Sequence, residues 1–162
     1  MPIYMKYGDI SGDVTTDGYK GWIELSSAQL GVSRQMTSGA GGAQRESSAP
    51  SISEIVITKV QDSSSPQLFR ESVGSRHGNT VQIKFGTTSK NKIETYLTLE
   101  LSDCAVSSYT LSGHGGDHHD HPQESLSLNF TKILFIPTPL DNKGNIKTGD
   151  RVQYDLTEMK AS

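Results

Sequence analysis

The densest group of chemically active side chains in this sequence is the segment 114–122, HGGDHHDHP. It contains four of the five histidines and two aspartates: His114, His118, His119, His121, Asp117 and Asp120. Imidazole nitrogens and carboxylate oxygens at this density could bind Zn²⁺, Ni²⁺ or Cu²⁺. The segment is rich in glycine, however, and ligands in such a loop are not preorganised as they would be along a rigid strand. A solvated hairpin loop that binds metals adventitiously is therefore the favoured interpretation.

A second interpretation of the same segment is a small metal-binding barrel of the cupin type. The metal motif of cupins has two alternate histidines and a following glutamate, which His119, His121 and Glu124 resemble. Two features oppose this interpretation. Glu124 comes one or two residues early, and no histidine follows His121 to build a second motif. The cupin-type barrel, with His114, His118, His119 and His121 as ligands, is retained as the alternative.

No other pattern in the sequence predicts catalysis. No Gly-x-Ser-x-Gly nucleophile elbow occurs. The glycine-rich stretches 39–42 and 113–116 do not open a helix after a strand, so neither predicts a phosphate cradle. We therefore expect no enzyme activity and no cofactor.

The length, net charge and cysteine content of the chain limit the kinds of protein it can be. The 162 residues suit one domain, 1–162, and the net charge of −3 argues against nucleic acid as a partner. Cys104 is the single cysteine, so no internal disulfide is possible, and we interpret it as a small buried strand residue. No signal-peptide pattern opens the sequence, and no apolar run approaches the ~20 residues of a membrane helix.

One helix is predicted among strands. Residues 55–60 are predicted to form a strand rich in β-branched residues, with Ile55, Ile57 and Val60 as its main apolar positions and Val56 and Thr58 between them. A helix over about 65–73 follows, with Ser65 as cap and Pro66 at the first helical position. Its apolar stripe of Leu68, Phe69 and Val73 is expected to pack the helix onto the body of the protein.

The rest of the chain predicts strands separated by turns. The expected strands are 3–7, 21–27, 30–36, 80–85, 93–101, 104–111, 125–136 and 151–156. A phase change in the apolar pattern at Thr131-Lys132 predicts a bulge. Residues 37–51 have no aliphatic side chain larger than alanine and are long for a plain connection. The fold class is mainly β: a compact barrel of two antiparallel sheets, with one short helix and a long extended loop.

The order of these elements resembles the haemolysin-coregulated protein (Hcp) family of type VI secretion systems. The strand-to-helix step is the most specific match, through Ile57-Thr58-Lys59, Asp62 and Ser65-Pro66-x-Leu68. Further matches are Met5–Gly12, Lys20–Leu25, Gly31–Arg34, the glycine-rich Ser38–Ala43, Ser127–Phe130 with Ile133, and Val152 with Tyr154.

The resemblance implies a structural tube subunit without catalytic activity. Subunits of the family close into hexameric rings, and the rings stack into a tube that is capped by a spike trimer and driven by a contractile sheath on a baseplate. Effector proteins ride inside the ring, which also chaperones them. The implied location is the bacterial cytoplasm before firing, followed by secretion through the apparatus without a signal peptide. No nucleic acid and no stable membrane insertion are expected.

The resemblance also assigns the long loop a role as the contact between stacked rings or adjacent subunits. The residues expected in this contact are Ser38, Gly39, Gly41, Gly42, Gln44, Arg45 and Glu46.

Overall fold

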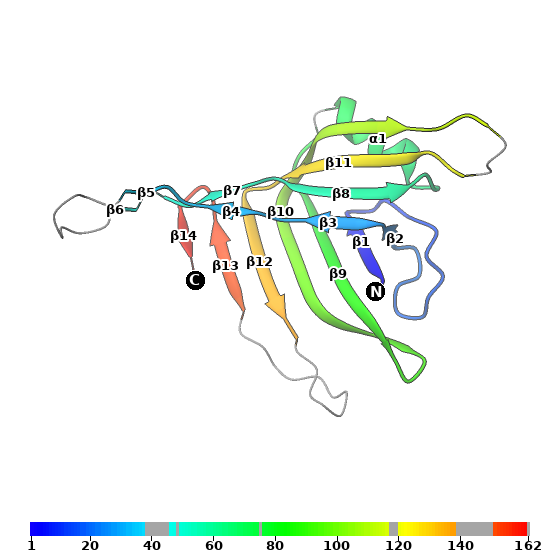
Figure 1. Ribbon diagram of the computed structural model, residues 1–162, viewed down its shortest axis with the longest axis horizontal. Coiled ribbons are helices and arrows are strands. Elements are labelled where there is room, and N and C mark those ends of the chain that lie inside the picture. Colours follow the sequence, from blue (N-terminus) through cyan, green and yellow to red (C-terminus); the bar gives the residue numbers. More distant parts are fainter. Residues whose placement is uncertain (38–45, 48, 75, 117–119, 139–150, 162) are drawn as a thin grey trace.

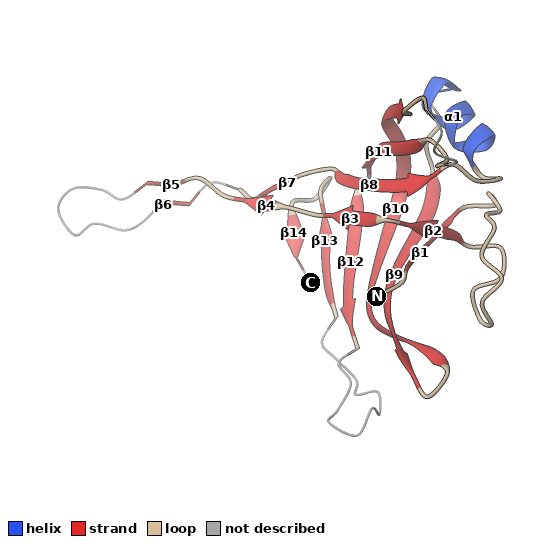
Figure 2. Ribbon diagram, turned by 45° about the vertical axis from the view of Figure 1, so that its right-hand side comes forward, coloured by secondary structure: helices blue, strands red, loops and turns tan. Residues whose placement is uncertain are grey.

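Two antiparallel sheets share one long strand in the computed structural model, which describes residues 1–37, 46–47, 49–74, 76–116, 120–138 and 151–161 (Figures 1 and 2). The large sheet has the order β2-β1-β9-β10-β12-β13-β14. Its strands are β2 (Ile23–Leu25), β1 (Ile3–Tyr7), β9 (Asn79–Ser89), β10 (Lys92–Ser112), β12 (Lys132–Pro137), β13 (Val152–Asp155) and β14 (Lys160–Ala161). The small sheet has the order β10-β11-β8-β3, with β11 (Gln123–Asn129), β8 (Ile55–Val60) and β3 (Ser27–Gln29).

Strand β10 carries the connection between the sheets. Its first half pairs with β9 and β12, and its second half, from Ala105, pairs with β11. The register against β9 shifts between Leu101 and Cys104, where Asp103 has φ 51°. An aspartate tolerates this left-handed conformation better than most residues, and the shift bends the strand from one sheet into the other. The two strands predicted at 93–101 and 104–111 are therefore one bent strand.

The segment predicted as a single bulged strand over 125–136 is divided between the two sheets. It leaves the small sheet at Asn129 and joins the large sheet at Lys132, and both parts lie antiparallel to β10. Leu126 and Leu128 face the core before the break, and Ile133 faces it after the break. The phase change at Thr131-Lys132 thus marks a transfer between sheets rather than a bulge within one.

A tight turn joins β9 to β10. Lys90 and Asn91 both have positive φ, 48° and 63°, and they separate Ser89 from Lys92, which are paired. Two central residues with positive φ define a type I′ turn, whose twist matches that of the strands it connects. The turn sets the register of the longest hairpin in the fold.

The hydrophobic core lies between the facing surfaces of the two sheets. Met5, Ile83 and Leu101 come from the large sheet, and Ile57 and Leu126 come from the small one; all are fully buried. The predicted fold class is confirmed: the described residues are mainly β, and they form two main sheets and one short helix. Within the described ranges the barrel is open, since no pairing joins β3 to the end strands of the large sheet.

Part of the long loop is a projecting β-ribbon, which we call the arm; the structure describes its residues 32–37, 46–47 and 49–52 (Figures 1 and 2). Strand β4 (Val32–Ser33) pairs with β7 (Ser51–Ile52), and β5 (Met36–Thr37) pairs with β6 (Glu46–Ser47). Ile52, and Leu30 just before the arm, pack against the core and fix its base. The arm has the form of a ribbon because its paired strands are only two residues long and enclose no hydrophobic core of their own.

Helix α1 (Ser65–Gly74) covers one end of the body and presents Leu68, not the whole predicted stripe, to the core. Leu68 is fully buried, whereas Phe69 is 52% and Val73 66% exposed. The packing role predicted for Val73 is therefore wrong. Phe69 packs only in part: its ring contacts the ring of Tyr109 edge-on, with 5.4 Å between the ring centroids. The reason is helical spacing: Ser65, Leu68 and Glu71 share the inward face, and Phe69 and Val73 lie beside it.

We expect Leu68→Ala to lower the free energy of unfolding by about 2–5 kcal/mol, because it leaves a cavity under the helix. Urea unfolding followed by circular dichroism measures the loss. Val73→Ala, on the exposed face of the same helix, is the matched control and should stay within about 0.5 kcal/mol of the wild type. A loss below about 1 kcal/mol for Leu68→Ala would contradict its assignment as the residue that anchors the helix.

Candidate functional site: the buried polar network and the exposed arm

A buried lysine lies at the centre of the polar chemistry in this structure. Strict alternation along β8 places Ile55, Ile57 and Lys59 on the core face, and Lys59 is fully buried. Val60, which the sequence pattern placed among the apolar residues of this strand, is 42% exposed. Sequence reasoning missed Lys59 because a lysine is almost never fully buried unless it is paired. The signal that could have found it is the two-residue period of the strand.

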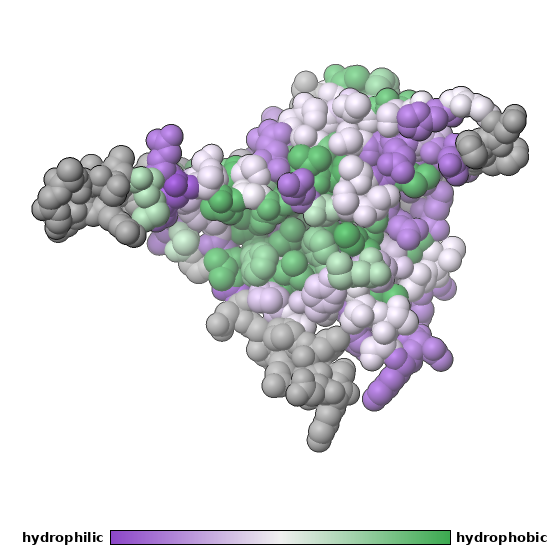
Figure 3. Space-filling model, in the orientation of Figure 1, coloured by the Kyte–Doolittle hydropathy of each residue, from purple (hydrophilic) through white to green (hydrophobic). Residues whose placement is uncertain are grey.

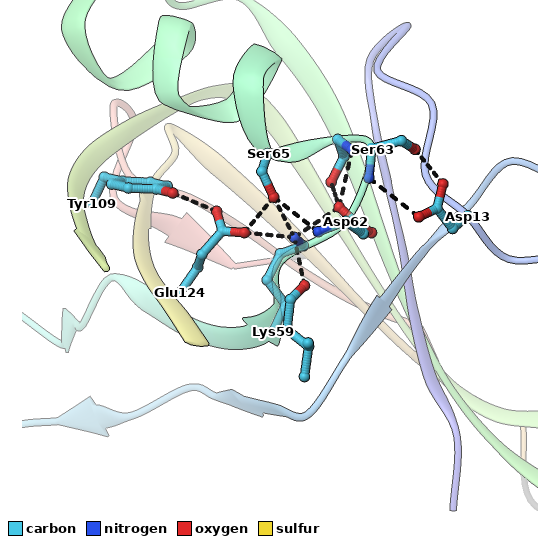
Figure 4. A network of polar contacts seen from close by, with 9 residues as sticks. Asp13, Lys59, Asp62, Ser63, Ser65, Tyr109 and Glu124 are labelled. Carbon is cyan, nitrogen blue, oxygen red and sulfur yellow. Dashed lines mark hydrogen bonds and ion pairs between the residues drawn. The ribbon is translucent and has the colours of Figure 1, made fainter. Parts of the chain in front are cut away.

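The ammonium group of Lys59 is fully satisfied by oxygen atoms (Figure 4). Its Nζ donates to Glu124 Oε1 at 3.1 Å, to Asp62 Oδ1 at 2.8 Å and to the carbonyl oxygen of Val60 at 3.0 Å. A fourth oxygen, Ser65 Oγ, lies farther away at 3.3 Å. Register explains the first of these contacts, since Lys59 on β8 lies directly opposite Glu124 on β11. An ammonium group has three protons to donate, so this arrangement uses its full capacity.

Glu124 is the matching acceptor and ties four elements together. Besides Lys59, it accepts hydrogen bonds from Ser65 Oγ and from the hydroxyl of Tyr109, the latter at 2.6 Å. These donors come from α1 and β10, so the carboxylate joins the helix to strands β10, β11 and β8 of the small sheet (Figure 4). Burial and the neighbouring Glu124 charge raise the pKa of Tyr109, which keeps its hydroxyl protonated as a donor.

The start of the helix differs from the predicted cap. The amide of Leu68 donates to the carbonyl of Ser64 at 3.0 Å, so Ser64 occupies the cap position and Pro66 the second helical position. The side chain of Ser65 binds Glu124 instead. Asp13 reaches the same turn from the loop after β1 and accepts from the amide of Ser63 at 3.2 Å. Its hydrogen bonds with Ser63 hold the pKa of the Asp13 carboxyl below its usual value.

The histidine-rich segment does not form a metal centre in the described part of the chain. His114 and His121 are exposed and line one open hollow with Asp120, while His118 and His119 lie outside the described residues. Among the described residues, no group of three or more histidine, cysteine or acidic side chains is arranged to hold a metal ion. Glu124, the third residue of the cupin-like pattern, is bound to Lys59 and turned away from any such role. The described residues give the cupin alternative no support.

Cys104 is a buried strand residue, as predicted, and it is fully shielded from solvent. Burial raises the pKa of its thiol to about 12, so the thiol stays protonated at neutral pH. A protonated, inaccessible thiol is a poor nucleophile and a poor metal ligand.

The arm presents apolar side chains to solvent. Val32 is 63% and Met36 is 59% exposed. Of the residues predicted to make the contact between subunits, Ser38, Gly39, Gly41, Gly42, Gln44 and Arg45 lie outside the described residues. The backbone of Glu46 lies in β6, opposite Thr37.

The architecture described above, with two sheets joined by β10, one helix and a projecting arm, has known relatives. A family model described as "Type VI secretion system effector, Hcp" matches residues 4–135. The chain belongs to the Hcp family. The resemblance found in the sequence is thereby confirmed.

Solved structures with the same fold cover nearly the whole of this Hcp chain. A type six secretion system protein is similar over 99% of both chains, with a TM-score of 0.92 and 23% identity. Hcp1 from Salmonella typhimurium is similar over 99% of this chain and 98% of its own, with a TM-score of 0.73 and 20% identity. Hcp3 from Pseudomonas aeruginosa is similar over 92% and 97%, with a TM-score of 0.59 and 18% identity.

Two further findings complete the comparison. No curated protein sequence matches this Hcp chain. Within the described residues, every helix is too short or too polar to cross a membrane.

A double-mutant cycle tests the energetic role of the buried pair. Lys59→Met or Glu124→Leu alone should each lower the free energy of unfolding by about 3–5 kcal/mol, because each leaves a buried charge without its partner. The double variant should lose less than the sum of the two, since no uncompensated charge remains in the pair. Urea unfolding provides all three values.

Lys92→Met, at an exposed lysine of β10, is the control and should stay within about 0.5 kcal/mol of the wild type. Additive losses in the double variant would show that Lys59 and Glu124 are not coupled and would contradict the network.

Proposed function

We propose that this protein is a structural subunit of the inner tube of a type VI secretion system. Six copies close into a ring, the rings stack into a tube, and effector proteins are carried or chaperoned inside. The observation that carries the proposal is the match of the Hcp family model to residues 4–135. The similarity of fold to solved Hcp structures over nearly the full chain supports it.

Features of the fold are consistent with assembly from repeated copies. The large sheet ends in β14 and the small sheet in β3, strands of two and three residues that leave little free edge for uncontrolled pairing. A ring built by head-to-tail contacts is heterologous: one surface of each copy meets a different surface of the next, and the ring closes by rotation. The arm is a natural candidate for one of these two surfaces.

The proposed role needs no catalysis by this chain. The buried carboxylate of Glu124 and the buried ammonium group of Lys59 bind one another, and Glu124 also binds Ser65 at the start of the helix. The proposed partners are further copies of the chain, a spike trimer, the contractile sheath and baseplate, and effector proteins. The protein would reside in the bacterial cytoplasm until the apparatus fires and would then leave through it.

The absolute mass of the purified, untagged protein tests the ring. Light scattering after size exclusion should give a species near six times 17.6 kDa, and negative-stain images of the same peak should show rings. The measurement is repeated over a range of protein concentrations and in the presence of a chelator. A stable monomer or dimer under all these conditions would contradict the ring, and a stoichiometric metal in the untagged protein would favour the cupin alternative.

Deletion of Gly39–Ser47 tests the proposed role of the arm. The shortened chain should fold with the circular dichroism spectrum of the wild type, because the deletion leaves the arm base, where Ile52 packs on the core, in place. Stacking of rings in images, and secretion from cells, should be lost. Stacking and secretion at wild-type levels would show that the arm makes no essential contact.

A further inference from the structure

A polar hollow lies between the second half of α1 and the turn that follows β1, beside the start of β9. Its volume is about 230 Å³, and its polar lining residues are Asp9, Gln67, Arg70, Glu71, Arg76 and Asn79. The spacing of Gln67, Arg70 and Glu71 places these three residues on one side of the helix. Two acidic and two basic side chains give the hollow both signs of charge and no net charge.

The hollow differs in character from the apolar surface of the molecule. Figure 3 shows apolar side chains gathered below β3 and β4. There the large sheet continues past the small one, and Phe135 and Val152 are 39% and 51% exposed. Apolar surfaces attract one another without preferred direction. Charged and hydrogen-bonding groups at fixed positions instead select a ligand by its chemistry, and the hollow offers such groups.

Glu71 is a buried carboxylate whose partners within the described chain are distant. It lies on the inward face of α1 and is 9% exposed. Its Oε2 accepts from the Asn79 amide at 3.4 Å, and its Oε1 lies 3.8 Å from Nη1 of Arg76, an exposed side chain. Good N–H···O hydrogen bonds measure about 2.7–3.2 Å. Glu71 also belongs to the last helical turn, at the negative end of the helix dipole, so a further cation would stabilise it.

A second buried group beside the hollow has no hydrogen-bond partner among the described residues. Tyr7 is fully buried, and its hydroxyl is unpaired. Burial, and less strongly the charge of Glu71, raise the pKa of Tyr7, so this hydroxyl stays protonated. Asn79 lies beside it, outside hydrogen-bond geometry. Because Glu71 and Asn79 both line the hollow, the unpaired hydroxyl borders it from the core side, where a ligand would relieve its lost hydration.

Gly8 keeps the space in front of the Asn79 carbonyl oxygen open. A Cβ atom at residue 8 would lie 3.1 Å from Asn79 Oδ1, and the φ of 50° at Gly8 favours glycine. The amide nitrogen of Asn79 is directed to Glu71, which leaves this oxygen as an acceptor. Glu71, Asn79 and Tyr7 thus supply three oxygen atoms at the inner wall, and an ammonium group has three protons to donate.

Two arginines supply the opposite charge on the solvent side of the hollow. Arg70 and Arg76 are both exposed. Within the described ranges Arg70 makes no ion pair, and Arg76 makes the long one with Glu71. A guanidinium group binds a carboxylate through two parallel hydrogen bonds. A ligand with both an ammonium and a carboxylate group would pair with Glu71 and free Arg76 to bind the carboxylate, so each charge would gain a partner.

We propose that this hollow binds a small free α-amino acid, whose ammonium group is held by Glu71, Asn79 and Tyr7 and whose carboxylate is held by Arg70 and Arg76. The ligand and the hollow match in charge, since both carry the two signs and no net charge. They also match in size, because the hollow is smaller than the roughly 300–1,000 Å³ of sites for drug-sized ligands. The inference goes beyond the proposed tube function and does not depend on assembly, because one chain supplies every contact.

Ligand-observed saturation-transfer NMR on the full chain, with titration, measures the binding of L-alanine. Ethylamine carries the ammonium group alone and propionate the carboxylate alone, so they are the matched probes. We expect saturable binding of L-alanine and at least about tenfold weaker binding of each half-ligand, which loses one charged contact. Tri-alanine, whose two charged groups are far apart, should also bind about tenfold more weakly, which distinguishes a free amino acid from the end of a peptide.

Substitutions at both ends of the hollow test the assignment. Glu71→Gln and Arg70→Gln should each weaken L-alanine binding about tenfold or more, since each removes one charge. Glu158→Gln and Arg151→Gln, at exposed positions away from the hollow, are the matched controls and should bind like the wild type. Tyr7→Phe separates ligand contact from structure. Without ligand its melting temperature should equal or exceed that of the wild type, because the hydroxyl it loses is unpaired, whereas L-alanine binding should weaken.

Several outcomes would overturn the inference. These are a wild-type chain without saturable L-alanine binding, a half-ligand that binds as tightly as L-alanine, and a Glu71→Gln chain that binds like the wild type. Tri-alanine binding as tight as that of L-alanine would show that the hollow recognises a peptide end, which contradicts a free amino acid. Should Glu71→Gln fail to fold, Arg70→Gln at its exposed position decides. All of these outcomes leave the ring untouched, because light scattering tests it separately.

Discussion

The pairing of the Lys59 ammonium with the Glu124 carboxylate constrains much of this fold. Both groups are fully buried, so each requires the other and each requires further hydrogen-bond partners. Those partners come from the start of the helix and from β10, and their geometry determines where α1 lies on the small sheet. An apolar pair at the same positions would make no directional contact with the helix and would not fix its position. The polar network instead specifies one position of the helix on the sheet. This specificity costs the free energy of removing two charged groups from water.

The sequence predicted the types of the elements better than the connections between them. Alternation and helix-start signals located β8, α1 and β9, because these depend on local spacing. The continuity of β10 through Asp103 and the transfer of 125–136 from one sheet to the other were not predictable from spacing, since both depend on which strands pair at long range. The helix stripe was overestimated for a similar reason: local periodicity cannot say which of two adjacent faces, that of Leu68 or that of Val73, meets the body.

The polar site shows the same division. Histidines and aspartates in 114–122 attracted attention because they are concentrated, yet the residues with the most specific contacts are a lysine and a glutamate 65 positions apart in the sequence. Their meeting depends on the register of β8 against β11, which a single sequence does not reveal. Exposed apolar positions are harder still to predict. Phe135 and Val152 resemble ordinary core residues in the sequence, and only the unequal width of the two sheets leaves them open.

The turn at Lys90-Asn91 has a consequence for the order in which the chain folds. Closing a two-residue loop costs far less chain entropy than bringing β1 to β9 across more than 70 intervening residues. The β9–β10 hairpin is therefore expected to nucleate folding, and β12 and β11 can then add to the free side of β10 with the remaining strands arriving later. The arm contributes almost nothing to this nucleus. Sequence changes in the arm are therefore expected to leave the folding rate of the chain nearly unchanged.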